Sequence, residues 1–250
     1  MDRNIWLQYI TNRGCPSWPC HICGKGTLLL VPGALVKTET VESAQARMEM
    51  DWEPEWISFA FTAWAQCTHP SCKQEFAIAG SGRVISRDHE ECEDGEDWEE
   101  VFYPKFCFPM PELISLPPNC PGDVIEELQN AFALFWSSTA ACAGRIRVAI
   151  EFLLNHLDVP KQMKGKNGKF FTLNLHARID EYSKNSSTIG SHLMALKWLG
   201  NTGSHDSALE ARDLLDAFEI LENSLAEIFD RRSARVAEMA QNLTRKHAKK

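Results

Sequence analysis

Four cysteines in the first third of the chain have the spacing of a metal-binding site. Cys20 and Cys23 form a CxxC pair that is followed by two glycines, and Cys67 and Cys72 form a second pair 44 residues further along. Four thiolates give the closed tetrahedral site of a structural zinc ion, with no open position for water. We therefore predict that these four cysteines bind Zn²⁺ in a structural role.

The surrounding residues leave the ligand set open. Cys15 and His69 are close enough in the sequence to replace one of the four thiolates. Catalytic zinc is not expected, because the chain has no HExxH motif and no HxE motif with a paired CxxC. An odd total of nine cysteines in a long chain also argues against a disulfide framework. Four cysteines are assigned no role: Cys92, Cys107, Cys120 and Cys142.

A second polar group lies in the C-terminal half. Asn201 and His205 belong to a Gly-Asn-x-x-x-His cluster between two helical segments, and Arg147 and Glu151 are one helical turn apart. A guanidinium can bind a phosphate through two hydrogen bonds, and an imidazole can transfer a proton near neutral pH. If the four side chains converge, they could cleave RNA without a metal. They could equally form a surface ion pair and a hydrogen-bond network that fixes the helices.

The elements that hold the cysteines are predicted to be strands. The ranges 26–31, 56–67 and 75–85 are rich in β-branched and aromatic residues. This pattern predicts a β-rich zinc-binding domain over residues 1–108. Four prolines between residues 109 and 118 forbid a regular helix, so a connector over 109–122 should run along the surface.

From residue 123 the apolar period changes to about 3.6 residues, which is typical of helices. Gly200 is predicted to end one helix, and Ser207 with Glu210 fits a capping box that starts the next, with His205 just before it. The fold class is thus α+β, a small zinc-ribbon-like domain followed by an all-α bundle over 123–240 and a basic tail over 241–250. Apolar stripes predict five helices, near 124–135, 146–157, 175–182, 189–199 and 214–228.

Charge is distributed unevenly along the chain. The net charge is −8, and the range 88–100 alone holds nine acidic residues, which we interpret as a solvated loop. The last twenty residues are basic and could contact nucleic acid, although a solvated helix end is the simpler interpretation. The Gly- and Lys-rich range 161–169 is interpreted as a mobile linker, with a phosphate-binding loop as the alternative.

No run of about 18 apolar residues is present, and the N-terminus lacks the layout of a signal peptide. We therefore expect a cytoplasmic protein that does not bind membranes.

The order of motifs resembles the family known as domain of unknown function 4145. The resemblance rests on the proline-rich connector 111–118, on Arg147-Val148-Ala149-Ile150-Glu151, on Arg178-Ile179-Asp180-Glu181 and on the range 199–205, and the Cys20/Cys23 pair is common in such proteins. That family is similar to the HEPN group of helical bundles. The resemblance implies a role in bacterial phage defence, restriction or toxin–antitoxin systems, in which HEPN proteins frequently act as dimeric, metal-independent ribonucleases.

One departure from the HEPN pattern bears on catalysis. Asn201 and His205 match its polar residue and histidine, but the positions allowed for its arginine hold Trp198, Leu199 and Gly200. We therefore expect a non-catalytic binding or assembly module that forms a homodimer through the bundle and binds RNA or a defence-system protein. The alternative is a metal-independent endoribonuclease in which Arg147 replaces the missing arginine.

Overall fold

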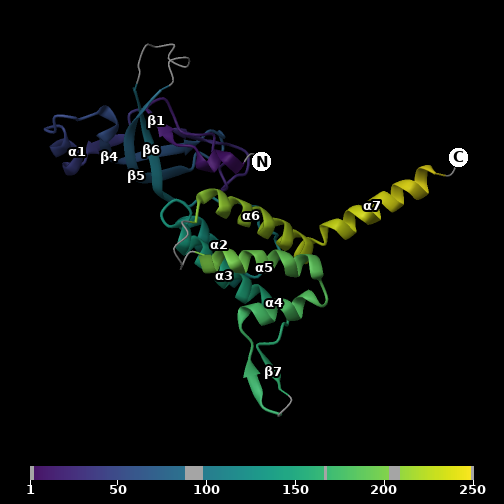
Figure 1. The fold of residues 1–250 in the computed structure, drawn as a ribbon. Coiled ribbons are helices and arrows are strands. Elements are labelled where there is room, and N and C mark those ends of the chain that lie inside the picture. Colours follow the sequence, from purple (N-terminus) through teal and green to yellow (C-terminus); the bar gives the residue numbers. More distant parts are fainter. Residues whose placement is uncertain (1–2, 88–97, 166–167, 203–208, 249–250) are drawn as a thin grey trace. The chain divides into compact units, whose positions relative to one another are not determined.

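The computed structural model describes residues 3–87, 98–165, 168–202 and 209–248. The chain divides into two compact units, residues 1–111 and residues 112–250. The first unit is rich in strands and the second is mainly helical (Figure 1). The predicted order of a β-rich region followed by a helical region is confirmed.

Within the described residues, an antiparallel sheet of six strands forms the N-terminal unit. The strands follow the order β1, β6, β5, β4 and β2, and β3 also pairs with β4. A helix α1, Val41–Ala46, follows β3. The strands are β1 Ile10–Thr11, β2 Leu28–Leu30, β3 Val36–Glu39, β4 Ser58–Cys67, β5 Glu75–Ser86 and β6 Trp98–Phe108.

Strands β2, β4 and β5 lie where the sequence predicts them, whereas β1, β3 and β6 were not predicted. Strand β6 begins inside the acidic range 88–100, so the interpretation of that range as a loop is wrong for its last three residues. Glu100 accepts a hydrogen bond from Asn12 Nδ2 at 2.8 Å and pairs with Lys37, which explains how an acidic residue is accommodated in a strand. Residues 88–97 lie outside the described part of the chain.

Alternation along β4 separates the two faces of the sheet. Phe59, Phe61, Ala63 and Ala65 are buried, while the residues between them point to the other face. Phe61 packs against Phe102 of β6, with ring centroids 5.2 Å apart. The core of this unit therefore lies on one side of the sheet.

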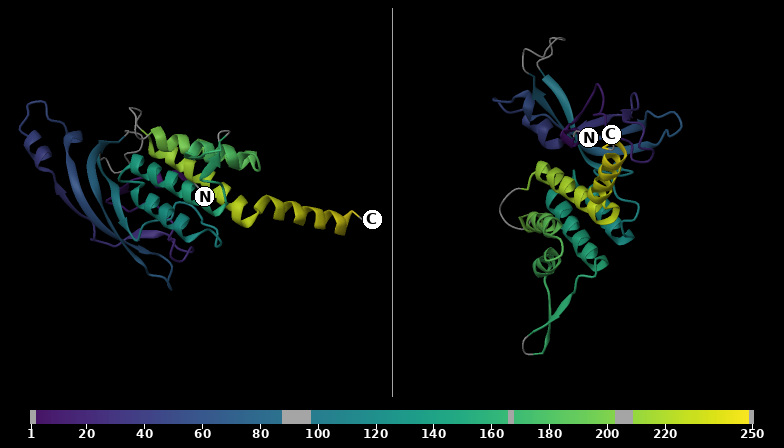
Figure 2. Two further views of the ribbon diagram at one scale, coloured as in Figure 1. Left: turned by 90° about the horizontal axis from the view of Figure 1, so that it is seen from below. Right: turned by 90° about the vertical axis from the view of Figure 1, so that its right-hand side faces the viewer.

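The C-terminal unit is built from helices whose apolar faces pack together. Helices α2 and α3 contact each other, as do α3 and α5, and α5 and α6 (Figures 1 and 2). A π-helical turn, Ala226–Asp230, joins α6 to α7. The helices are α2 Gly122–Leu134, α3 Thr139–His156, α4 Leu175–Ser183, α5 Ser187–Thr202, α6 Ala211–Leu225 and α7 Arg232–His247.

The five predicted helices correspond to α2 through α6, but several of their ends differ, and α3 begins at Thr139, before the predicted range 146–157. Gly200 does not end its helix but lies inside α5, which continues to Thr202. At this position α5 approaches α3 closely, since a Cβ atom at Gly200 would lie 3.3 Å from Arg147 Cβ. Helix α6 begins at Ala211, and its capping box is formed by Glu210 with Asp213. The predicted cap Ser207 lies outside the described residues, and the helix starts later than that prediction requires.

The segments around the helices also differ from their predictions. Residues 161–169 are not a simple linker, since β7, Gln162–Lys164, pairs with β8, Phe170–Thr172, in an antiparallel hairpin. In the connector, Leu113 and Ile114 are buried, and the Ser115 N–H donates to Glu222 of α6 at 2.8 Å, so this part does not simply run along the surface.

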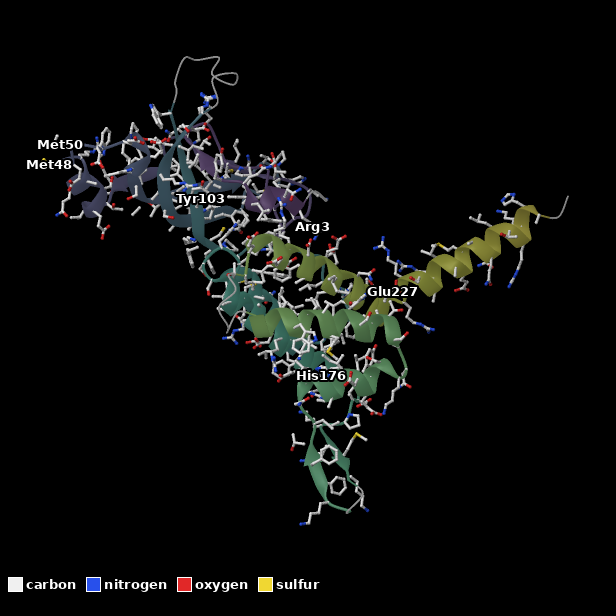
Figure 3. The ribbon with its side chains drawn as sticks, viewed as in Figure 1. Arg3, Met48, Met50, Tyr103, His176 and Glu227 are labelled. Carbon is white, nitrogen blue, oxygen red and sulfur yellow. The ribbon has the colours of Figure 1, made fainter. Side chains whose placement is uncertain are left out.

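Helix α7 is exposed along its whole length. Its start is held by Glu227 (labelled in Figure 3), which accepts a hydrogen bond from Ser233 Oγ at 2.6 Å. The predicted basic tail begins within this helix.

Candidate functional site

The four predicted cysteines come together in the N-terminal unit. Cys20 Sγ lies 3.9 Å from Cys72 Sγ, and Cys23 Sγ lies 3.6 Å from Cys67 Sγ. All four sulfur atoms lie within 4.8 Å of one another. The cluster could therefore hold one metal ion.

The first pair lies on a tight turn before β2. The Gly24 N–H donates to the Cys20 carbonyl at 2.8 Å, and the Cys20 N–H donates to the Gly26 carbonyl at 2.9 Å. Gly24 has a φ of +62°, a conformation that glycine adopts at no steric cost. The turn brings Cys20 and Cys23 to the same side.

The second pair lies on the turn between β4 and β5. Cys67 ends β4, and the His69 carbonyl accepts hydrogen bonds from the N–H groups of Cys72 at 3.0 Å and Lys73 at 3.3 Å. The His69 N–H points back at Cys67 Sγ, 3.4 Å away. A donor aimed at a sulfur favours its thiolate form.

Pairing between β2 and β4 brings the two turns together. Leu28 lies opposite Cys67 in the register, and the Thr68 N–H donates to the Thr27 carbonyl at 2.9 Å. A Cβ atom at Gly26 would lie 2.5 Å from Cys67 Sγ and 2.8 Å from the His69 nitrogen. Only glycine fits where the first turn crosses the second.

The pKa values of three thiols of the cluster, Cys20, Cys23 and Cys67, are shifted in different directions. Backbone N–H groups, that of Lys25 foremost, lower the pKa of Cys23 to about 6, so this thiol is ionised at neutral pH. Burial raises the pKa of Cys67 to about 12 and also raises the pKa of Cys20. A bound cation would favour the thiolate form of all four, because metal ligation requires deprotonated sulfur.

The spacing of the sulfur atoms fits a tetrahedral metal site. A Zn–S bond of about 2.3 Å places tetrahedral ligands about 3.8 Å apart. The Cys23–Cys67 and Cys20–Cys72 sulfur pairs, at 3.6 and 3.9 Å, agree with that separation. The arrangement suits a tetrahedral ion of the kind that thiolates select, which includes zinc and iron.

The two alternative ligands are not part of this cluster. Cys15 Sγ donates to the Leu28 carbonyl at 3.4 Å, and the group of ligand atoms found in the described part of the chain contains neither Cys15 nor His69. Three cysteines without a predicted role, Cys107, Cys120 and Cys142, are buried. Burial raises the pKa of Cys142 to about 12, so this thiol stays protonated.

The second candidate group lies in the helical unit. Arg147 Nε and Glu151 Oε1 of α3 are 3.8 Å apart, and the side chains are 33% and 47% exposed, so the predicted pair borders the solvent. A Cβ atom at Gly200 would lie 3.3 Å from Arg147 Cβ, which places Arg147 beside the last turn of α5. Asn201 lies in that turn, but nothing is described of its side chain, and His205 lies outside the described residues.

Arg178 is a structural residue that we did not single out as a site. Its side chain is 6% exposed, and its guanidinium donates to Asn155 Oδ1 at 2.9 Å, the Val159 carbonyl at 3.1 Å and the Glu151 carbonyl at 3.4 Å. Burial lowers its pKa, while the nearby Glu151 charge opposes that shift. Arg178 lies three residues after Leu175, so it falls on the apolar face of α4. This position in the sequence is the signal that could have identified a buried arginine.

Glu151 therefore faces both arginines. Its carboxylate pairs with Arg147, and its backbone carbonyl accepts from Arg178. The contacts of Arg178 with Glu151 and Asn155 tie α4 to α3, whereas the Arg147–Glu151 pair lies within α3.

In the described part of the chain, no helix is both long and apolar enough to cross a membrane.

Comparison with known proteins assigns each half of the chain to a different family model. No curated protein and no solved structure matches the chain. Residues 8–107 match the model described as Domain of unknown function (DUF8608), and residues 129–248 match the model described as Domain of unknown function (DUF4145). The Cys20/Cys23 turn lies within the first match. The proline-rich connector 111–118 lies before the start of the second match at residue 129.

Proposed function

We propose that this chain is a non-catalytic binding and assembly module whose N-terminal unit is stabilised by a structural zinc ion. Four thiolates would complete the coordination sphere of zinc, which leaves no position for a substrate or an activated water. The ion would fix the two turns at one end of the sheet. Metal analysis of the purified chain should find one zinc ion per molecule, and iron or no metal would contradict this assignment.

The observation that carries the binding role is an exposed aromatic face on the sheet. In the register Trp64, Ala77 and Phe108 form one row across β4, β5 and β6, and the neighbouring row contains Ala79 and Phe106. Trp64, Phe106 and Phe108 are 49%, 55% and 62% exposed. We call these five residues the aromatic sheet face. Contiguous exposed apolar surface of this kind is typical of an interaction site.

The net charge of the N-terminal unit as a whole favours a protein partner over a nucleic acid. Residues 1–111 contain 9 Lys and Arg against 17 Asp and Glu, and nine of these acidic residues fall in the range 88–100. Such an excess of negative charge repels phosphate backbones and attracts cations. The partner that fits is a basic amphipathic segment of another protein, whose apolar side chains would pack between the rings over Ala77 and Ala79.

The biological context of the proposal comes from the resemblance to HEPN-like bundles. In that context the helical unit would supply a homodimer, and the partner would be a protein of a bacterial defence system.

The test uses synthetic helical peptides as the probe. A leucine- and lysine-containing peptide should bind the wild-type chain, and Phe106→Ser/Phe108→Ser should weaken that binding by at least about tenfold, since each ring removes a large apolar contact. A leucine- and glutamate-containing peptide should not bind. The matched control is Phe170→Ser/Phe171→Ser, which removes two equally exposed rings from the hairpin and should leave peptide binding unchanged. Equal loss in both variants would overturn the assignment.

The second candidate is a metal-independent endoribonuclease, and the position of Arg147 beside the last turn of α5 favours it. In that mechanism His205 would take the proton of the 2′-hydroxyl as its oxygen attacks phosphorus, the P–O5′ bond would break, and the leaving 5′-oxygen would take a proton from water. Arg147 would stabilise the charge on phosphorus, with Glu151 and Asn201 orienting the two groups. We expect the purified chain to leave total RNA intact. Cleavage that is lost in both Arg147→Ala and His205→Ala would replace the non-catalytic proposal.

A further inference from the structure

The β7–β8 hairpin exposes aromatic and basic residues together. Phe170 and Phe171 are 69% and 51% exposed, and Met163 is 37% exposed. All six strand residues are exposed, and the hairpin stands apart from the helices (Figure 1). An isolated two-stranded hairpin is marginally stable in water, so two exposed phenylalanines on it are not explained by its own packing.

The register places one ring on each face of the hairpin. Phe170 lies opposite Lys164, and Phe171 lies opposite Met163. Consecutive residues of a strand point to opposite faces, so the two rings are presented in opposite directions. One ring has a cation beside it, and the other has a thioether.

The hairpin is also basic. No Asp or Glu occurs between residues 159 and 179, whereas Lys161, Lys164 and Lys169 are exposed on it. The Gly165 N–H donates to the Lys169 carbonyl at 2.8 Å, and this bond closes the turn. The lysines are thus held at defined positions beside the rings.

We propose that this hairpin binds single-stranded nucleic acid. Unpaired bases would stack on Phe170 and Phe171, and Lys161, Lys164 and Lys169 would contact the phosphates, as aromatic platforms with flanking cations do for single strands. A membrane surface fits less well. Lys164 lies level with Phe170, and Lys169 lies nearer the tip of the hairpin than either ring, whereas insertion into a membrane would require the rings to lie nearest the tip. The inference concerns the helical unit and does not depend on the aromatic sheet face.

Fluorescence anisotropy with a labelled oligouridine of about 12 nucleotides tests the inference on the full chain. The Phe170→Ala/Phe171→Ala variant should bind on the order of 30-fold more weakly, because two stacking contacts are lost. The Phe170→Tyr/Phe171→Tyr variant should keep wild-type affinity. In Lys161→Ser/Lys164→Ser, the slope of log affinity against log salt should become shallower by about 1.4, or about 0.7 per lysine.

Matched controls separate stacking from general attraction. Arg235→Ser/Arg245→Ser removes the same charge from α7, and Phe106→Ala/Phe108→Ala removes two rings from the sheet, so both should retain binding. Equal losses in either control would overturn the inference, as would equal affinity for polyglutamate or for a fully paired duplex. An unchanged thermal transition of the hairpin variants will show that they fold. Phe106→Ala/Phe108→Ala changes only the aromatic sheet face, so its effect on nucleic-acid binding is measured separately from that of the hairpin variants. Failure of this inference can therefore be told apart from failure of the proposed protein partner.

Discussion

The N-terminal and C-terminal units differ in the contacts that stabilise each of them internally. In the N-terminal unit, four sulfur atoms from two turns lie within 4.8 Å of one another at one end of an antiparallel sheet. In the C-terminal unit, broad apolar faces of the helices and one buried guanidinium supply the corresponding contacts. A metal ion bound by these thiolates would concentrate stability in a few atoms, whereas helix packing spreads it over many. Single substitutions should therefore have unequal effects in the two units.

The largest effect is expected for Cys67→Ser. Removing one of four thiolates should abolish tight metal binding and lower the unfolding free energy of the first unit by more than about 4 kcal/mol, since structural zinc contributes directly to folding. Metal analysis and calorimetry will measure both, and the transition of the second unit should stay in place. The control is Cys107→Ser, a buried cysteine outside the cluster that should leave the metal bound. Full metal content in Cys67→Ser would refute the ligand assignment.

Gly26→Ala should have the next largest effect. The added methyl group would meet Cys67 Sγ at 2.5 Å, so one of the two turns must move. We expect metal affinity to fall by about 10- to 100-fold, as it does when residues that support metal ligands are changed. Competition with a chelator will measure the change. Gly14→Ala, where the methyl group meets nothing within 4 Å, should behave as wild type.

Arg178→Ala tests the C-terminal unit, in which helix packing and a buried guanidinium supply the stabilising contacts. It would leave the Val159 carbonyl and the Asn155 side chain without their donor, and we expect a loss of about 3 kcal/mol in the stability of the second unit alone. Calorimetry and metal content together will show which unit responds. Arg145→Ala, which removes an exposed pair with Glu127, should cost less than about 1 kcal/mol. A shift in the first transition would mean that the two units are not independent.

The smallest effect is expected for Arg147→Ala. Its pair with Glu151 is partly exposed and 3.8 Å long, so the helical unit should lose only about 0.3 kcal/mol. Urea titration of the second transition will detect whether the loss is larger. A loss of several kcal/mol would show that Arg147 belongs to the structural network around Arg178.

The regular parts of the fold could be predicted because their signals are local. Apolar residues at a period of 3.6 identified α2 through α6, and β-branched and aromatic runs identified β2, β4 and β5. Strand β6 was missed because its first residues are acidic, and pairing with β5 together with the contacts of Glu100 with Lys37 and Asn12 stabilises them there. The β7–β8 hairpin was missed because its Gly and Lys residues resemble those of a linker.

The sequence by itself predicted the four cysteines that come together, because a CxxC pair with following glycines restricts the turn whatever the rest of the chain does. Only the tertiary structure decided which further residues support it. Gly26 approaches Cys67 because β2 pairs with β4, and Trp64, Phe106 and Phe108 share a face because three strands align in one register. Contacts of this kind join residues far apart in the sequence, and they depend on strand pairing and helix packing that no local pattern encodes.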